Sequence, residues 1–202
     1  MAAGDLADTA KKKEEGTTIV FADEAGFLMN PSVKATWAPV GQTPVVVYRN
    51  RHHKKVSVLG ALALFADGHI ETFLDWYPGT YVRSVEAAQF LERLLREVVG
   101  SIVVVWDNLN AHRSPMVREV VGRNPRLTLE YLPPYAPDLN PVEALWCQAK
   151  YHRMANHAID DLATLESQAK RHVAAIAAEQ RLLLACFGAA KLPVALYQAR
   201  DQ

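Results

Sequence analysis

Three acidic residues, Asp23, Asp107 and Glu143, each stand where a hydrophobic segment gives way to a polar one. A carboxylate in such a place is held rigidly, because the apolar segment behind it is fixed in the core. Three carboxylates that meet repel one another unless a cation lies between them, and hard divalent ions such as Mg²⁺ prefer oxygen ligands. Two such ions could stabilise the attacking and leaving oxygens of a phosphoryl transfer. These residue types therefore favour metal-dependent phosphodiester chemistry.

Asp107 follows the clearest strand of the chain, in the stretch 101–112 with the sequence SIVVVWDNLNAH. An uncharged, mostly β-branched run of this kind is typical of a strand buried on both faces. Asn108 and His112 come directly after it, where strand ends collect ligands in α/β sheets. Taken alone, Asp107 is equally well explained as the start of a turn or the cap of the next helix.

Glu143 is expected in the first turn of a helix. Prolines between 133 and 137 form a rigid approach, Asn140 is a natural N-cap, and Pro141 fits the first helical position. The helix dipole favours an ionised carboxylate there. Taken alone, a first-turn glutamate is common in any helix, and the nearby Asp138 is interpreted as a turn residue. Trp146 is expected to pack this helix onto the sheet rather than to contact DNA.

Asp23 ends a predicted strand from Thr17 to Ala22, and Glu24 follows it. Neighbouring residues of a strand point to opposite faces, so only one of the two carboxylates can join a given site. The residues alone leave the choice between Asp23 and Glu24 open.

Three sequence blocks together resemble the catalytic domain of DDE transposases, in the mariner superfamily and its bacterial insertion-sequence branch. They are ADEAGF, WDNLNAH and LPPYAPDLNPVEALW, and the resemblance extends from about Thr17 to Ala158. The last block is the most specific, because a proline-rich entry followed by Leu-Asn-Pro, Glu and Trp rarely arises by chance. The short spacing between Asp107 and Glu143 is also typical of that superfamily.

The resemblance implies a catalytic triad of Asp23, Asp107 and Glu143 that binds two Mg²⁺ ions, with Mn²⁺ as a substitute. Asp23 would bridge both ions, and each of the other two would hold one. Water would then cut DNA at the element end, and the freed 3′-hydroxyl would attack target DNA. Asn108 and His112 are supporting residues: His112 would orient a metal-bound water or contact phosphate, or else make a structural hydrogen bond. A homodimer assembled on DNA is implied as well.

Charge bears on DNA binding through its distribution. The formal net charge is zero, which counts against a general nucleic-acid binder. Two basic runs stand out, and either can equally be a solvated turn; the second, just after Glu143, is the better phosphate candidate. The DNA-binding candidates in them are Arg49, Arg51, His52, Lys54, Lys55, Lys150 and Arg153.

The order of the elements predicts the fold. Three antiparallel strands come first, then a helical crossover, then strand, helix, strand and helix. After the first strand, the expected elements are strands at 55–65 and 69–76, a helix at 84–100, the strand before Asp107, a helix at 114–121, a strand at 127–131 and the helix after Asn140. This is the order of an α/β, ribonuclease-H-like fold with a central mixed five-stranded sheet flanked by helices. Its first and fourth strands are neighbours, which would bring Asp23 and Asp107 side by side.

Three regions are expected: a flexible N-terminal lead at 1–16, the ribonuclease-H-like domain at 17–158, and a helical extension at 159–202 that packs on the core or on a partner. Short strands are predicted at 35–39 and 43–48, with Trp37 in a small core. Sixteen residues before the first strand cannot contain the helix-turn-helix domains that usually recognise element ends. That recognition is expected from a separate domain or protein.

Composition excludes several classes of protein. Half of the 202 residues are apolar, which is enough for one well-filled domain. Two cysteines without metal or disulfide spacing suit a reducing bacterial cytoplasm, and nothing resembles a signal peptide or a membrane span. A soluble, intracellular protein is therefore expected, and the resemblance to bacterial transposases implies that it is associated with the nucleoid.

Two other functions stay open. A structure-selective nuclease would use the same carboxylates without strand transfer, and the proline-rich block argues against it. A non-catalytic remnant that binds DNA or dimerises would tolerate loss of the triad, and the presence of all three acidic residues argues against that.

Overall fold

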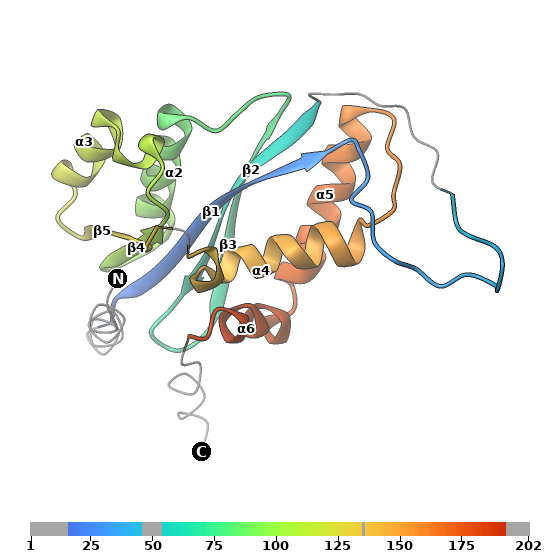
Figure 1. The fold of residues 1–202 in the computed structure, drawn as a ribbon. Coiled ribbons are helices and arrows are strands. Elements are labelled where there is room, and N and C mark those ends of the chain that lie inside the picture. The colour runs from blue at the N-terminus through green and yellow to red at the C-terminus, as the bar shows by residue number, and fades with distance from the viewer. Residues whose placement is uncertain (1–15, 46–53, 135, 193–202) are drawn as a thin grey trace, which may run out of the picture.

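The computed structural model describes residues 16–45, 54–134 and 136–192. Figure 1 shows how the elements are arranged in space. In chain order they are β1 (Thr18–Leu28), β2 (Lys55–Leu64), β3 (Ile70–Pro78), α2 (Ser84–Glu97), β4 (Ile102–Trp106), η1 (Asn110–Arg113), α3 (Pro115–Arg123), β5 (Leu127–Tyr131), η2 (Pro137–Leu139), α4 (Pro141–Cys147), the π-helical η3 (Gln148–Arg153), α5 (Leu162–Ala177) and α6 (Gln180–Ala189). Of the helices described, none is long and apolar enough to cross a membrane.

The five strands form one mixed sheet in the order β3-β2-β1-β4-β5. The pairs β1–β2 and β2–β3 are antiparallel, whereas β4 runs parallel to both β1 and β5. Phe21 of β1 lies opposite Val105 of β4, the last pair between these strands. The predicted mixed five-stranded sheet is confirmed, and its first and fourth strands are neighbours.

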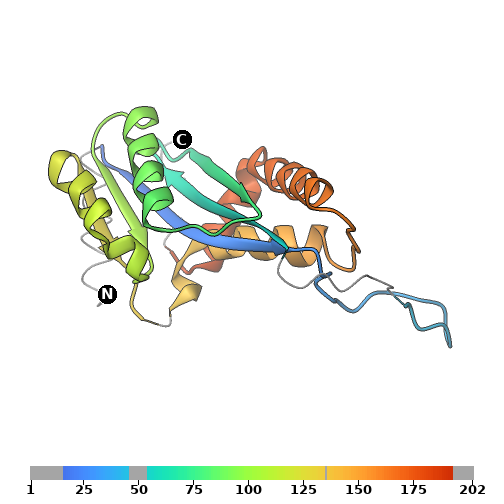
Figure 2. The ribbon, with the colours of Figure 1, turned by 90° about the horizontal axis from the view of Figure 1, so that it is seen from above.

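Helices cover both faces of the sheet (Figures 1 and 2). One buried cluster joins the sheet to α2 and α3, and the other joins it to α4, α5 and α6. Along β1 the side chains alternate between these clusters: Ile19 and Phe21 belong to the second, Val20 and Ala22 to the first. A strand covered on both sides needs apolar residues at successive positions, which explains the uninterrupted hydrophobic runs of β1 and β4.

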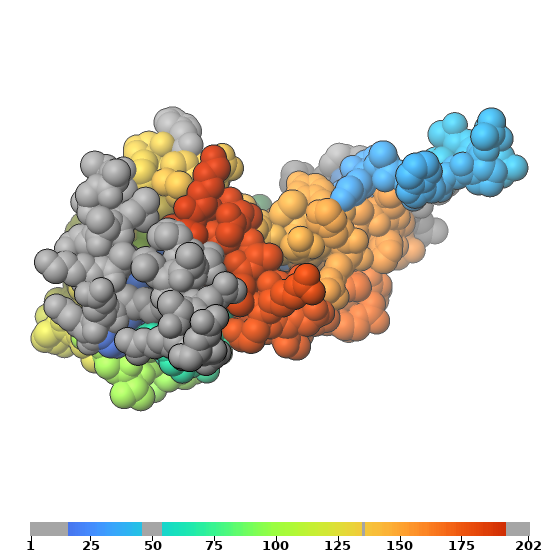
Figure 3. Space-filling view, turned by 90° about the horizontal axis from the view of Figure 1, so that it is seen from below, coloured from blue at the N-terminus to red at the C-terminus, as the bar shows by residue number. Residues whose placement is uncertain are grey.

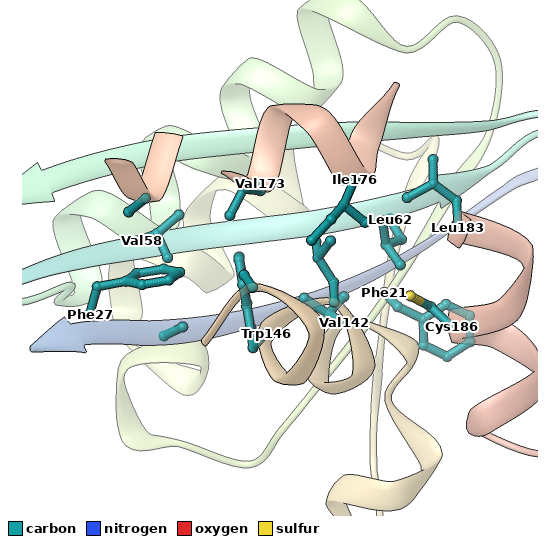
Figure 4. Close-up of a cluster of buried hydrophobic side chains, with 14 of the residues drawn as sticks. Phe21, Phe27, Val58, Leu62, Val142, Trp146, Val173, Ile176, Leu183 and Cys186 are labelled. Atoms are coloured by element: carbon teal, nitrogen blue, oxygen red, sulfur yellow. The ribbon is translucent and has the colours of Figure 1, made fainter. Parts of the chain in front are cut away.

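The core beneath α4, α5 and α6 includes much of the C-terminal region. Figure 4 shows Phe21, Phe27, Val58 and Leu62 of the sheet against Val142 and Trp146 of α4, Val173 and Ile176 of α5, and Leu183 and Cys186 of α6. The ring of Phe21 meets Phe187 edge-on, with centroids 5.7 Å apart. As far as residue 192, the predicted C-terminal helical region therefore contains two helices that pack on the sheet. Its division from 17–158 as a separate region stays a prediction.

β1 is longer than expected, and the prediction that it ends before Asp23 is wrong. The strand continues to Leu28, which pairs with Lys55 of β2. Ala25 and Phe27 continue the buried alternation and keep this part of the strand in the sheet. Asp23 thus lies within a strand, level with the place where the neighbouring β4 ends.

The segment 31–45, which runs from blue to cyan in Figures 1, 2 and 3, extends away from the sheet and helices. It contains no strand, so the prediction at 35–39 is wrong, and the predicted strand at 43–48 lies partly outside the described residues. Pro39 and Pro44 lack the N–H group that a sheet ladder requires. Trp37 is 100% exposed, so its predicted core packing is also wrong.

Candidate active site

Asp23 points from β1 toward α4, where the indole Nε1–H of Trp146 donates a hydrogen bond to Asp23 Oδ2 at 2.9 Å. Burial, together with the nearby negative charges of Glu143 and Glu24, raises the pKa of Asp23 from 3.8 to about 8. The hydrogen bond opposes this shift only in part, because an indole is a neutral donor. Asp23 is therefore a carboxyl group whose ionised form is poorly compensated, although the positive charge of Lys150 interacts with both Asp23 and Glu143.

Gly60 makes the contact between Trp146 and Asp23 possible. It lies opposite Asp23 in the β1–β2 ladder. A Cβ atom at Gly60 would lie 2.6 Å from Cη2 of Trp146, closer than such atoms approach in proteins. The missing side chain therefore lets the indole ring cross β2 and reach the carboxylate.

Asp107 follows the last residue of β4, and the β1–β4 register sets it beside Asp23. Its Oδ1 accepts a hydrogen bond from Leu109 N at 3.0 Å and lies 2.8 Å from His112 Nδ1. Burial raises the pKa of Asp107, but the hydrogen bonds from His112 and Leu109 N–H outweigh it and hold the pKa below its ordinary value. Asp107 is thus a charged carboxylate at neutral pH.

Glu143 lies in the first turn of α4, as predicted, and its side chain is exposed. Asn140 caps this helix by accepting a hydrogen bond from Val142 N at 3.1 Å. The same side chain donates from Nδ2 to the carbonyl oxygen of Ala22 at 2.9 Å. Because Ala22 precedes Asp23 in β1, Asn140 ties the start of α4 to the strand beside that carboxylate.

All three predicted carboxylates line one cavity of about 470 Å³. The sheet supplies Asp23, the loop after β4 supplies Asp107, and α4 supplies Glu143. The rest of the lining comes from Asn108, Leu109, Leu132, Pro133, Pro134, Ala136, Pro137 and Asn140. One wall is therefore acidic and the other mostly apolar and rigid, because prolines fix the backbone dihedral angles there.

The donor set suits a hard divalent cation, since all three side chains offer carboxylate oxygens. Burial and then the repulsion from Glu143 and Glu24 raise the pKa of Asp23, and a bound cation would offset both by favouring the ionised carboxylate. Within the described ranges, no three His, Cys, Asp or Glu side chains are already gathered closely enough to hold a metal ion. Coordination by all three carboxylates would require their side chains to draw together.

His112 and Asn108 take different places. His112 is buried, does not line the cavity, and stacks on Trp106 with ring centroids 4.0 Å apart. This arrangement fits the structural hydrogen-bonding role better than direct contact with phosphate. Asn108 lines the cavity and donates from Nδ2 to the carbonyl oxygen of Leu132 at 2.7 Å, which ties the two loops together.

The predicted DNA-binding residues that the structure describes lie at or just before the start of β2 and in η3. Lys55 lies at the start of β2 with Nζ 3.7 Å from the ring centroid of Tyr81, and Lys54 before it is exposed. Lys150 lies over the ring of Phe27 at 5.5 Å, and Arg153 is 3.8 Å from Glu179. Arg49, Arg51 and His52 lie outside the described residues.

Sequence reasoning missed three contributions to the site. Glu24 contacts His112, Gly60 admits Trp146, and Trp146 binds Asp23 in addition to packing its helix. For Glu24 the alternation of side chains along a strand was a signal, because it placed Glu24 on the face opposite Asp23. It did not show which residue Glu24 contacts there. The role of Gly60 had no signal, since it depends on a residue far away in the chain.

Comparisons with solved structures agree with this fold. The Mos1 strand transfer complex matches with a TM-score of 0.66 and 18% identity, over 96% of this chain and 57% of that one. The Mos1 mariner paired end complex with Mn matches with a TM-score of 0.64 and 20% identity, over 98% of this chain and 60% of that one. The catalytic domain of Mos1 mariner transposase matches with a TM-score of 0.59 and 16% identity, over 95% of this chain and 87% of that one. This chain thus spans 57% to 60% of the chains in the two complexes, and the shared fold is ribonuclease-H-like.

No curated protein sequence matches the chain significantly. A protein family described as "DDE superfamily endonuclease" matches residues 18–166. That match covers the whole sheet, the cavity and α4, and therefore well over half of the chain. The chain belongs to the DDE superfamily of endonucleases.

Proposed function

We propose that this chain is the catalytic core of a DNA transposase of the mariner superfamily, in its bacterial insertion-sequence branch. The observation that carries the proposal is that Asp23, Asp107 and Glu143 line one cavity although they come from β1, the end of β4 and α4. The shared fold with Mos1 transposase supports the same reading. In this proposal the three residues are the catalytic triad.

We propose that Asp23, Asp107 and Glu143 hold two Mg²⁺ ions, or Mn²⁺ in their place. A Mos1 complex with Mn has the same fold. When bound, such ions stabilise the attacking and leaving oxygens of an in-line phosphoryl transfer. The partly buried Asp23 would contribute its charge to both ions, and the other two carboxylates would each contribute theirs to one. Trp146 keeps Asp23 oriented toward the cavity.

The reaction has two steps of the same kind. In the first, water attacks a phosphodiester at the element end, the bond to the 3′ oxygen breaks, and a 3′-hydroxyl remains. In the second, that hydroxyl attacks a phosphodiester of target DNA, its oxygen is joined to the phosphorus, and the bond to the target's own 3′ oxygen breaks to leave a 3′-hydroxyl there. Neither step needs a covalent bond to the protein. The apolar wall of the cavity limits the water around the reacting phosphate.

DNA is the proposed partner, and the chain acts as a homodimer assembled on it. A separate helix-turn-helix domain or protein recognises the element ends, and the reaction takes place at the nucleoid in the cytoplasm. Lys150 and Lys55 support phosphate contacts because both lie near the end of β1 beyond Asp23. The complete proposed set of DNA contacts is Arg49, Arg51, His52, Lys54, Lys55, Lys150 and Arg153.

The proposal is tested with Asp107→Asn, which keeps the size of the side chain and removes its charge. The substrates are supercoiled plasmid, to detect nicking, and a labelled duplex with a free 3′-hydroxyl, to detect joining to plasmid DNA. With Mn²⁺ or Mg²⁺ present, we expect Asp107→Asn to reduce both reactions by at least about a thousandfold while circular dichroism stays unchanged.

Asp138→Asn is the matched control, because Asp138 is an exposed aspartate near Glu143 that does not line the cavity of about 470 Å³. It should cut and join like the wild type. Cleavage by Asp107→Asn at the wild-type rate would disprove the assignment. Metal-dependent cleavage without any joining would indicate a nuclease rather than a transposase.

A further inference from the structure

We propose that Glu24 is a positioning residue that acts through His112 to hold Asp107 in place for metal binding. This inference rests on the proposed function, because it assigns a role relative to the proposed metal ligand Asp107. Glu24 is the neighbour of Asp23 in β1, but it lies on the opposite face of the sheet and does not line the cavity.

The contact is a continuous chain of three side chains. His112 Nε2 lies 2.7 Å from Glu24 Oε1, and His112 Nδ1 lies 2.8 Å from Asp107 Oδ1. The imidazole thus has a carboxylate on each of its nitrogens, and it donates to both when it is protonated. Through this ring, a residue of β1 is linked to the loop that follows β4.

Packing limits the movement of His112, and the contact with Glu24 sets the orientation of its ring within that packing. Its side chain is 1% exposed and lies nearly parallel to the buried ring of Trp106, with an interplanar angle of 8°. The hydroxyl of Tyr131 donates to the backbone carbonyl of His112 at 3.2 Å. A ring held in this way cannot follow Asp107 if that carboxylate moves, so it restricts the rotation of the carboxylate instead.

The restriction falls on one oxygen of Asp107. Both His112 Nδ1 and the backbone N–H of Leu109 contact Oδ1. Oδ1 therefore already has two donors, and Oδ2 is the oxygen left for a ligand. Residues that orient a metal ligand from behind typically contribute a factor of about 10 to 100 in metal affinity.

The alternation of side chains along β1 explains why Asp23 and Glu24 have different roles. Asp23 points to α4 and the cavity, whereas Glu24, which is 20% exposed, points to η1 on the other face. Without an acceptor at Glu24, His112 would lose the partner of Nε2 and could turn away from Asp107. The acidic pair thus serves one site from both sides of the sheet.

The experiment measures Mn²⁺ binding to the full chain by calorimetry and electron paramagnetic resonance, without DNA. We expect Glu24→Ala to raise the Kd for Mn²⁺ by about 10-fold or more. Glu24→Gln should stay within about threefold of the wild type, because its amide oxygen still accepts a hydrogen bond from His112. Glu24→Met keeps the length of the side chain without an acceptor and should behave like Glu24→Ala, which covers the case in which Glu24→Ala fails to fold.

Two further variants show whether the effect passes through Asp107. When Asp107 is already replaced by Asn, adding Glu24→Ala should cause no further loss of Mn²⁺ affinity. Glu119→Ala removes an exposed carboxylate from α3 and controls for the loss of one negative charge; its Kd should equal that of the wild type.

The outcomes separate the inference from the proposed function. If Asp107→Asn weakens Mn²⁺ binding but Glu24→Ala and Glu24→Met do not, the inference is wrong and the metal site stands. The inference would also be wrong if Glu24→Ala reduced the Mn²⁺ affinity equally in the wild type and in the Asp107→Asn variant. If the wild-type chain binds no Mn²⁺, the proposed metal site fails and the role of Glu24 fails with it.

Discussion

The neighbouring carboxylates Asp23 and Glu24 lie on opposite faces of the sheet and have different partners there. On the α4 side, Asp23 meets a neutral indole at 2.9 Å and the negative charge of Glu143. On the α2 and α3 side, Glu24 meets an imidazole at 2.7 Å that also contacts Asp107. Burial lowers the pKa of His112, but the hydrogen bonds to Asp107 and Glu24 outweigh it and raise the pKa to about 9.

This difference shows how one short segment supports two kinds of site. Around His112, one imidazolium lies between two carboxylates, so much of their negative charge is offset within the protein. Around Asp23, burial and then the charges of Glu143 and Glu24 disfavour the ionised carboxylate and raise its pKa. A poorly compensated carboxylate beside an open cavity favours a cation ligand, whereas a closely paired one favours rigidity.

The largest expected effect concerns Trp146, which belongs both to the core and to the Asp23 side of this comparison. Trp146→Ala should lower the free energy of unfolding by about 3–5 kcal/mol, because a large buried ring leaves a cavity. The affinity for Mn²⁺ should fall as well, since Asp23 loses its hydrogen-bond donor. Urea denaturation and calorimetry measure the two effects.

Phe187→Ala is the control for Trp146→Ala. Phe187 lies in the same core, against Phe21, and touches none of the carboxylates of the cavity. It should lose a similar amount of stability and keep its Mn²⁺ affinity. Equal Mn²⁺ binding by both variants would show that Trp146 contributes only packing.

A smaller effect is expected at Gly60. Gly60→Ala would set a methyl group 2.6 Å from Cη2 of Trp146, so the ring must shift away from Asp23. We expect the free energy of unfolding to fall by about 1–3 kcal/mol, as for other overpacked cores. Gly122→Ala in α3 is the control: no atom lies within 4 Å of the added Cβ, and alanine should stabilise the helix by up to about 1 kcal/mol. A Gly60→Ala protein as stable as the wild type would refute the close approach of the indole.

Much of this arrangement could be predicted from local patterns. The β-branched run before Asp107 and the Asn-Pro start before Glu143 each determine their own element, because buried strands and helix caps have short-range signals. The order of the elements then predicted that β1 and β4 are neighbours. The joint position of the three carboxylates at one cavity agrees with that prediction, and their catalytic role stays a proposal.

The remainder depends on contacts that no local pattern records. β1 continues past Asp23 because β2 supplies a partner as far as Lys55, which is visible only in the folded sheet. Trp37 was expected in a core, since large aromatic rings usually are, but its segment lies outside the packed layers. The contact of Glu24 with His112 joins residues 88 positions apart.

The smallest expected effect, for each unit of pH, is a change in folding stability that differs between the Asp23 face and the Glu24 face of the sheet. In the chain freed of metal with a chelator, Asp23 has a pKa of about 8 when folded and 3.8 ordinarily. The folded state therefore holds one more proton than the unfolded state between these values, and stability is lost as the pH rises from about 4 to 8. From pH 5 to pH 6 the loss should be up to about 1.4 kcal/mol, and Asp23→Asn should remove it.

His112 also makes the protein less stable as the pH rises, but over a higher pH range than Asp23 does. Its pKa is about 9 in the folded chain against 6.5 ordinarily, so its contribution is complete below about pH 6.5 and is lost as the pH rises to 9. His112→Asn should therefore change the slope of stability between about pH 7 and 9 and leave the step from pH 5 to 6 nearly unchanged. If His112→Asn also altered the step from pH 5 to 6, the charges of the two faces would be one coupled system, and the contrast between the two faces would be lost.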